Sequence, residues 1–86
     1  MKIILLTSKY CYPCERAKKE VRSLLHKYPS IYIDIVERPH QYFIDYQVVN
    51  TPTLIFDNNG TVDSLCGAHL IKKIELEGLL RDLELI

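Results

Sequence analysis

The sequence has 86 residues, of which 48% are hydrophobic and 26% charged, with only three glycines and four prolines. This composition is typical of an ordinary globular chain and excludes disorder, collagen-like repeats and low-complexity segments. Basic and acidic residues both number 11, so the formal net charge is zero, whereas a general nucleic-acid binder carries a basic excess. The length predicts a single domain over residues 1–86.

The N-terminal hydrophobic run at 3–6 is shorter than the roughly 7–15 residues of a signal-peptide core. No other stretch approaches the roughly 18 hydrophobic residues of a membrane span. Three cysteines, an odd number, do not suit a secreted disulfide scaffold. We therefore expect a cytoplasmic protein with no membrane partner, in which a CxxC pair is catalytic or metal-binding rather than structural.

Hydrophobic spacing predicts a strand, a helix and a second strand in the first half of the chain. Residues 3–6 form a continuous, β-branched run that is typical of a buried central strand. After a loop at 7–13, a helix is expected from Cys14 until Pro29, with its inner positions at helical spacing: Ala17, Val21, Leu24, Leu25 and Tyr28. Alternating isoleucines at 31–35 predict the second strand.

The second half is expected to contain a weak helix at 39–46 with hydrophobic contacts from Phe43, Ile44 and Val48. Residues 53–56 predict a third strand, and Asp-Asn-Asn-Gly at 57–60 indicates a hairpin that returns as an antiparallel strand at 61–65. A last helix is expected from about His69, with an inner stripe at Ile71, Ile74, Leu76 or Glu77, Leu79, Leu80 and Leu83.

The motif Cys-Tyr-Pro-Cys at 11–14 joins the first strand to the first helix. A thiolate, rather than a thiol, attacks disulfides, and a helix N-terminus stabilises it through unpaired N–H groups and a positive dipole end. We therefore expect Cys11 to ionise readily, with Lys9 stabilising its thiolate. Cys14 begins the hydrophobic stripe of the helix and should be the less exposed thiol. Cys11 is thus predicted to attack and Cys14 to resolve the mixed disulfide.

The chain resembles the thioredoxin/glutaredoxin superfamily over nearly its whole length. Cys-Tyr-Pro-Cys-Glu-Arg-Ala-Lys at 11–18 is similar to the glutaredoxin run C-P-Y-C-x-R-A-K with Tyr and Pro exchanged. Residues 46–54 are more similar to thioredoxins, as are Asn-Gly-Thr-Val at 59–62 and Cys-Gly-Ala at 66–68. Together these features are typical of a small, glutaredoxin-like thioredoxin.

The resemblance implies a minimal, thioredoxin-like α/β fold of order β-α-β-α-β-β-α, with a four-stranded mixed sheet flanked by three helices. It implies an enzyme, a protein-disulfide reductase that acts in electron transport and cell redox homeostasis. No cofactor is expected besides the redox-active Cys11–Cys14 disulfide. The expected partners are disulfide-containing proteins and an upstream reductase similar to thioredoxin reductase, and the protein is expected to be a monomer.

The resemblance also implies a substrate groove beside the CxxC motif. A cis Thr51–Pro52 bond is expected there, because the superfamily carries a cis-proline at this place. Since Pro52 has no N–H, the main chain of Thr51 remains free to pair with an incoming peptide. The residues assigned to substrate binding are Tyr10, Tyr12, Pro13, Thr51, Pro52, Cys66 and Gly67.

Glutathione is the second choice of electron donor. In glutaredoxins its recognition involves a T-V-P segment and a Gly-Gly and Asp pair at the start of the last helix. Here the second segment reads Gly-Ala-His-Leu at 67–70, which lacks the carboxylate that would hold the amino group of glutathione.

Cys66 leaves three interpretations open. It is a small hydrophobic filler that faces the groove, a regulatory thiol that is glutathionylated or exchanges with Cys11, or a metal ligand. In the third case Cys66 and His69 join Cys11 and Cys14 as a nominal Cys₃His set, the ligand types of structural zinc. A zinc-binding or redox-inactive interaction module is therefore the alternative function, although the resemblance favours redox chemistry and no metal.

Overall fold

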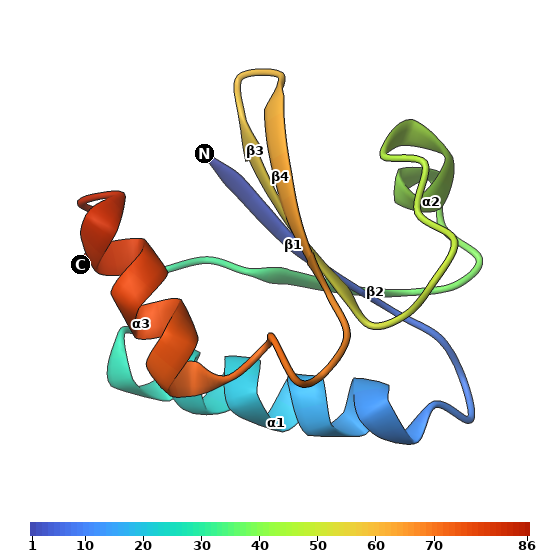
Figure 1. Cartoon of the computed structure of the whole chain (residues 1–86), viewed down its shortest axis with the longest axis horizontal. Helices are drawn as coiled ribbons and strands as arrows, with labels where there is room; N and C mark the ends of the chain where they lie inside the picture. The colour runs from blue at the N-terminus through green and yellow to red at the C-terminus, as the bar shows by residue number, and fades with distance from the viewer.

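A computed structural model describes residues 1–86 and contains four strands and three helices in the predicted order. Figure 1 shows how they follow one another: β1 (Lys2–Thr7), α1 (Tyr12–Lys27), β2 (Asp34–Glu37), α2 (Gln41–Asp45), β3 (Thr53–Asn58), β4 (Thr61–Cys66) and α3 (Lys73–Asp82). None of the helices combines the length and the hydrophobicity needed to cross a membrane.

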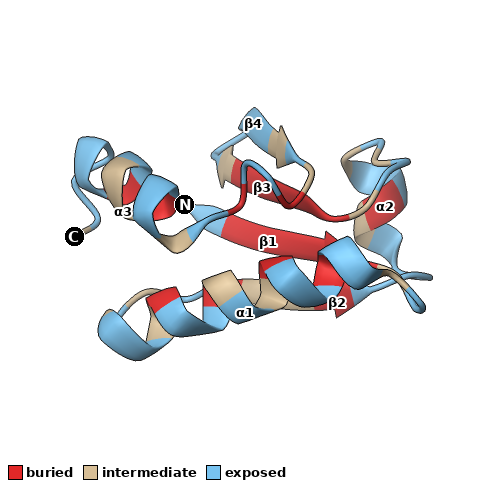
Figure 2. Cartoon of the chain, turned by 60° about the horizontal axis from the view of Figure 1, so that its bottom comes forward, coloured by how far each residue is buried: buried red, intermediate tan, exposed pale blue.

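The sheet has the strand order β2-β1-β3-β4, with β1 parallel to β2 and the other two pairs antiparallel. This is the mixed four-stranded sheet that was expected. β1 lies inside the sheet and its residues from Ile3 to Thr7 are buried, which explains its continuous hydrophobic run (Figure 2). β4 is an edge strand, and most of its residues are exposed.

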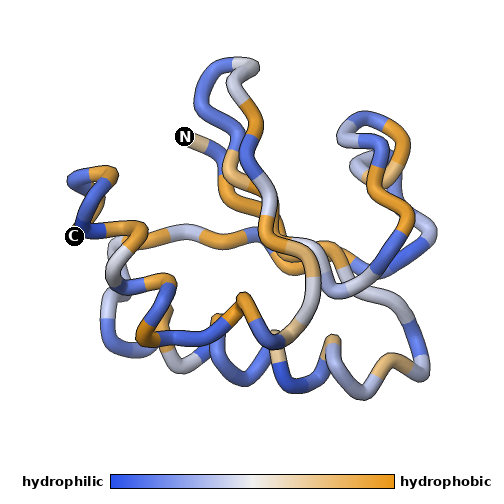
Figure 3. The backbone as a smooth tube through the Cα atoms, in the orientation of Figure 1, coloured by the Kyte–Doolittle hydropathy of each residue, from blue (hydrophilic) through white to orange (hydrophobic).

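Two hydrophobic clusters cover the two faces of the sheet. One cluster joins Ile3 and Leu5 of β1 to residues of α1 and α3, among them Val21, Leu24, Leu76 and Leu80. The other joins Ile4 and Leu6 to Phe43 of α2. Because successive side chains of a strand point to opposite faces, β1 supplies both clusters. Helices α1 and α3 therefore lie on one face and α2 on the other (Figure 1), and the hydrophobic strands between them stand out in Figure 3.

Helix α1 begins two residues earlier than the hydrophobic stripe predicts. Pro13 lies in its first turn, where a missing N–H costs no helical hydrogen bond, and Cys11 is the N-cap. At the other end the N–H of Tyr28 bonds to the carbonyl of Leu24, and Pro29 follows. The cysteine motif therefore belongs to the first turn of the helix.

β2 starts at Asp34 and not at residue 31 as predicted. The segment before it first turns away from α1, with the N–H of Ile31 bonded to the carbonyl of Tyr28. Only from Asp34, which pairs with Ile4, does the chain run beside β1. In the short helix α2, Phe43 is buried as expected but Ile44 is 72% exposed, so the prediction of a contact from Ile44 is wrong.

The last helix begins at Lys73, four residues later than predicted. The loop before it makes its own turns, in which the N–H groups of Leu70 and Ile71 bond to the carbonyls of Gly67 and Ala68. Ile71 is completely buried although it precedes the helix, and Leu76 and Leu80 are buried as predicted. Ile74 is 76% exposed, and Leu79 and Leu83 are also exposed, so the predicted stripe is wrong at these three positions.

Candidate active site

A disulfide links Cys11 and Cys14 at the end of the sheet where β1 passes into α1. Cys14 is completely buried against the core, as expected, whereas Cys11 is partly exposed. A reagent in solution therefore has access to the Cys11 side of the disulfide. This asymmetry allows a reaction in which Cys11 exchanges with an outside partner while Cys14 stays inside.

The sulfur of Cys11 is the N-cap group of α1. Its Sγ atom accepts a hydrogen bond from the main-chain N–H of Cys14 at 3.1 Å, and its carbonyl accepts one from the N–H of Glu15 at 3.2 Å. α1 has 16 residues, so its N-terminus carries a full helix dipole. Both effects favour negative charge on this sulfur once the disulfide is reduced.

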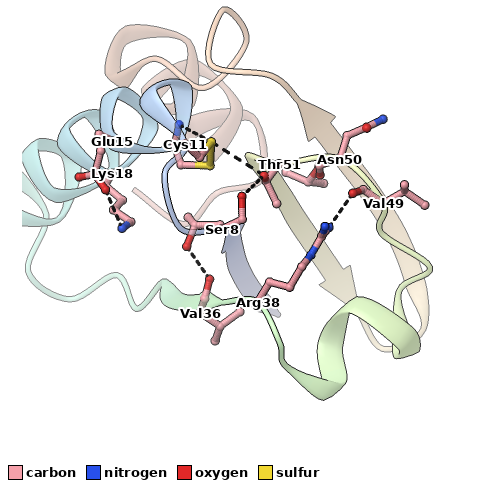
Figure 4. The surroundings of a disulfide bond; sticks show 12 residues. Ser8, Cys11, Glu15, Lys18, Val36, Arg38, Val49, Asn50 and Thr51 are labelled. Atoms are coloured by element: carbon pink, nitrogen blue, oxygen red, sulfur yellow. Dashed lines mark hydrogen bonds and ion pairs between the residues drawn. A yellow bond between two sulfur atoms is a disulfide. The ribbon is translucent and has the colours of Figure 1, made fainter.

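Two hydroxyl groups approach the Cys11 sulfur from the other side (Figure 4). Thr51 Oγ1 donates to Cys11 Sγ at 3.9 Å, and the Oγ of Ser8 lies 2.7 Å from the same Thr51 oxygen. Thr51 comes from the loop before β3 and Ser8 from the loop after β1. Thr51 was predicted as a site residue, whereas Ser8 was missed, because its sequence neighbours give no sign of a partner 43 residues away.

The Thr51–Pro52 peptide bond is cis, as expected, and Pro52 is buried. The carbonyl of Pro52 accepts a hydrogen bond from the N–H of Gly67 at 2.9 Å, which ties the loop after β4 to the loop before β3. The main-chain N–H and C=O of Thr51 have no partner within the chain. One donor and one acceptor thus remain available beside the sulfur.

Exposed aromatic rings flank Cys11 on both sides in the sequence. Tyr10 is fully exposed and Tyr12 is 76% exposed, and Pro13 beside them is also exposed. Such rings offer a large contact area with a polar tip, which suits a surface that binds other proteins. Three of the predicted site residues therefore present their side chains to solvent next to the disulfide.

Gly67 adopts φ +103°, a left-handed conformation that favours glycine. A Cβ atom at this position would lie 2.7 Å from the His69 ring. Only glycine therefore fits here without displacement of the ring. Because Gly67 also bonds to Pro52, its conformation determines how the loop after β4 reaches the site.

Cys66 is exposed and takes part in no disulfide. Cys66 of β4 pairs with Thr53 of β3, the residue that follows Pro52. The Cys₃His set of the alternative interpretation is not assembled, because the sulfurs of Cys11 and Cys14 are bonded to each other. No three His, Cys, Asp or Glu side chains anywhere in the chain are grouped to hold a metal ion.

Two basic residues differ in how they relate to the site. Lys9 is exposed and belongs to neither of the two ion pairs of the protein. Arg38 was not predicted, yet its Nη2 donates to the carbonyl of Val49 at 2.6 Å and its guanidinium lies 4.6 Å from the centre of the Phe43 ring. Arg38 thus anchors the loop that carries Thr51 (Figure 4).

Comparisons with known proteins agree with this architecture. No protein-family model matches the sequence, and no curated protein matches it. Among solved structures, the Trypanosoma brucei brucei thioredoxin superposes with a TM-score of 0.78 at 19% identity, covering 99% of this chain and 75% of that one. The Fasciola hepatica thioredoxin gives 0.75 at 20% identity, with 93% and 77% covered. Oxidised thioredoxin O2 from Arabidopsis thaliana gives 0.73 at 21% identity, with 95% and 73% covered. The chain therefore has a thioredoxin-like fold.

Proposed function

We propose that the protein is a dithiol–disulfide oxidoreductase that reduces disulfides in other proteins. The observation that carries this proposal is the Cys11–Cys14 disulfide at the N-terminus of α1, with Cys11 partly exposed and Cys14 buried. The fold shared with thioredoxins supports the same chemistry. The free main chain of Thr51 beside the sulfur supports a peptide as the substrate.

In the proposed reaction the reduced enzyme carries a thiolate on Cys11. This thiolate attacks one sulfur of the substrate disulfide, whose S–S bond breaks, and the other substrate sulfur leaves as a thiolate and takes a proton. Cys14 then loses its proton and attacks the Cys11 sulfur of the mixed disulfide. The second substrate thiol is released, and the two electrons of the enzyme's dithiol have passed to the substrate.

Substrate binding follows from the groups around Cys11. An extended segment of the substrate pairs with the N–H and C=O of Thr51, as a strand pairs with a sheet edge. Tyr10 and Tyr12 supply the contact area on one side, and the loop at Cys66 and Gly67 supplies the other. Because these contacts involve the main chain or flat rings, they tolerate many substrate sequences.

The electrons for each new cycle come from a reductase similar to thioredoxin reductase, in preference to glutathione. The segment at 67–70 contains no carboxylate for the amino group of glutathione, and His69 does not supply an anion. The protein needs no cofactor beyond its own disulfide and acts in the cytoplasm as a monomer. A coupled assay with purified thioredoxin reductase and with glutathione plus glutathione reductase separates the two sources.

The decisive experiment is a redox titration of the purified protein. It is equilibrated in dithiothreitol buffers of graded potential, its free thiols are alkylated, and the disulfide is located by peptide mass. We expect one reversible Cys11–Cys14 bond with a midpoint of roughly −270 to −200 mV, the range of thioredoxin and glutaredoxins, while Cys66 stays free. A disulfide that does not reform, or one that involves Cys66, contradicts the proposal.

A further inference from the structure

A basic hollow lies beside the candidate active site. It has a volume of about 420 Å³ and is lined by Arg16, Lys19 and Glu20 of α1 and by Ala68 and Lys72 of the loop that leads into α3. Three of its five lining residues are therefore cationic and one is anionic. This hollow is called the basic hollow below.

The cations of the basic hollow have no carboxylate partner. The two ion pairs of the protein join other residues, Lys18 to Glu15 and Lys27 to Glu77. Glu20, the one acid in the lining, is already engaged, because its Oε1 accepts a hydrogen bond from the main-chain N–H of Lys73 at 3.0 Å. The positive charge of Arg16, Lys19 and Lys72 is thus available to an outside anion.

Lys72 occupies a position where its charge is unfavourable for folding. It is the N-cap of α3, and its side chain makes no capping hydrogen bond. Ser, Thr, Asp or Asn are preferred at an N-cap, and a cation there faces the positive end of the helix dipole. The dipole and the lysine both contribute positive potential to the basic hollow, and Glu20 at the first N–H of the helix offsets only part of it, which favours the binding of an anion.

The basic hollow is close enough to the disulfide to contact the same substrate. Arg16 and Lys19 follow Cys11 by five and eight residues, which corresponds to about 8 and 12 Å along the helix axis. Ala68 follows Gly67, whose N–H is bonded to Pro52 beside the free main chain of Thr51. A substrate segment that pairs with Thr51 reaches the basic hollow after about three or four extended residues.

A different hollow of the molecule contains two aspartates. A second hollow, lined in part by Asp63 of β4 and Asp82 at the end of α3, lies at the side of the hairpin and the C-terminus. Figure 1 shows that the hairpin tip projects away from α1. Since the formal net charge is zero, the positive potential of the basic hollow comes from the local grouping of Arg16, Lys19 and Lys72 and not from an overall excess of basic residues.

We propose that the basic hollow binds an acidic segment of the disulfide-containing substrate and thereby selects substrates with Asp or Glu about three or four residues from the cysteine that Cys11 attacks. This inference rests on the proposed reductase function. The hollow is larger than one carboxylate and its cations come from two elements, which fits a segment with more than one acidic side chain. Such charges raise the rate of encounter and fix the direction of the bound segment.

The test compares two synthetic peptides that each contain one disulfide. The acidic peptide has two glutamates three and four residues from the attacked cysteine, and the neutral peptide has glutamines there. Reduction by the reduced full-length protein is followed at low salt and at high salt. We expect the acidic peptide to react about tenfold faster at low salt, and we expect this advantage to shrink strongly at high salt, since screening weakens exposed charge contacts.

Charge reversal provides the matched controls. In Lys19→Glu/Lys72→Glu we expect the preference to invert, so that the neutral peptide reacts faster. Arg22→Glu/Arg81→Glu makes the same change in net charge at exposed positions outside the hollow and should keep the preference for the acidic peptide. Circular dichroism spectra verify that all variants are folded.

Each outcome separates this inference from the proposed function. If neither peptide is reduced, the reductase function itself is wrong. If both peptides are reduced at equal rates, or if the two double variants behave alike, the basic hollow does not select substrates. If phosphate abolishes the preference while chloride at the same ionic strength preserves it, the hollow is a site for a small anion and the inference is wrong.

Discussion

The Oγ atoms of Ser8 and Thr51 lie 2.7 Å apart, although 43 positions separate the two residues in the sequence. This contact joins the loop after β1 to the loop before β3, directly behind the disulfide. Because Thr51 also donates to the Cys11 sulfur at 3.9 Å, the Ser8 hydroxyl holds the Thr51 hydroxyl in the direction of that sulfur. Ser8 therefore acts as a positioning residue for Thr51.

Replacement of Thr51 by valine should make Cys11 react less readily at neutral pH. Valine keeps the shape of threonine but donates no hydrogen bond to the thiolate, and a hydrogen bond to a charged group stabilises it by about 1.5–3 kcal/mol when well formed. At the long distance seen here we expect the midpoint of the pH–alkylation profile of Cys11 to rise by about half a unit. Ser8→Ala should give a smaller shift in the same direction, and no shift in Thr51→Val would refute this role of the hydroxyl.

The two cysteines should respond differently to replacement by serine. Cys11→Ser should abolish turnover, because Cys14 is completely buried and does not reach the substrate. Cys14→Ser should accumulate a mixed disulfide between Cys11 and the substrate, visible as an added mass that dithiothreitol removes. If Cys14→Ser keeps full turnover, a monothiol route operates and the assignment of Cys14 as the resolving cysteine is wrong. Cys66→Ser serves as the control for the third thiol and should complete the cycle without accumulating a mixed disulfide.

Gly67→Ala should lower both stability and turnover. The substitution forces an L-residue to φ +103° and places a Cβ 2.7 Å from the His69 ring. Such a conformation costs about 1–3 kcal/mol, which urea unfolding measures directly. In Gly67→Ala/His69→Ala the overlap with the ring is removed but the unfavourable φ remains, so we expect partial recovery. Full recovery would show that the ring alone, and not the backbone, requires glycine.

Tyr46 and Asp57 should make stability depend on pH at both extremes. The Tyr46 hydroxyl donates to Asp57 Oδ2 at 2.6 Å, which raises the pKa of Tyr46 to about 12 and, together with the N–H of Gly60, lowers the pKa of Asp57. Because the pKa of Asp57 is lowered in the folded protein, its ionised carboxylate stabilises the fold above the usual aspartate pKa, and this stabilisation is lost as the pH falls through the folded value. Because the pKa of Tyr46 is raised in the folded protein, its protonated hydroxyl stabilises the fold below the usual tyrosine pKa, and this stabilisation is lost as the pH rises toward 12.

Tyr46→Phe removes this hydrogen bond and therefore tests both ends of the pH range. Thermal melts between pH 2 and pH 7 should show a weaker loss of stability toward acid than in the unaltered protein. The ultraviolet titration should lose the tyrosine that ionises last. Tyr32→Phe, at a side chain that is 78% exposed, is the control and should leave the loss of stability between pH 7 and pH 2 unchanged. If Tyr46→Phe and the unaltered protein lose the same stability between pH 7 and pH 2, the hydrogen bond between Tyr46 and Asp57 is contradicted.

Much of the fold follows from local sequence patterns. The central strand is buried on both faces, so its residues at 3–6 are continuously hydrophobic. Helix α1 is buried on one face only, so its hydrophobic residues Ala17, Val21 and Leu24 recur at helical spacing. The Asp-Asn-Asn-Gly turn marks the β3–β4 hairpin, where the N–H of Gly60 bonds to the Asp57 side chain. The cysteine motif is found for the same reason, since strand, motif and helix are contiguous.

The features that sequence did not predict depend on contacts between distant segments. α3 begins at Lys73 rather than near His69, because Glu20 of α1 accepts the hydrogen bond of its first N–H. The spacing of hydrophobic residues in α3 does not reveal that Glu20 binds its first N–H. Ile74 points outward for the same reason, since the start of the helix determines which face packs on the core. The Ser8–Thr51 contact depends on how two loops meet, and no local pattern encodes it.

The N-cap role of Cys11 links the chemistry of the site to the backbone of α1. Its sulfur receives the Cys14 N–H bond, so every change in the bonding of that sulfur alters the electron density that this amide proton experiences. The oxidised protein, the thiolate and the mixed disulfide each give the proton a different acceptor. The Cys14 amide is therefore a built-in nuclear magnetic resonance reporter, which distinguishes the stages of the catalytic cycle by its chemical shift without any attached label.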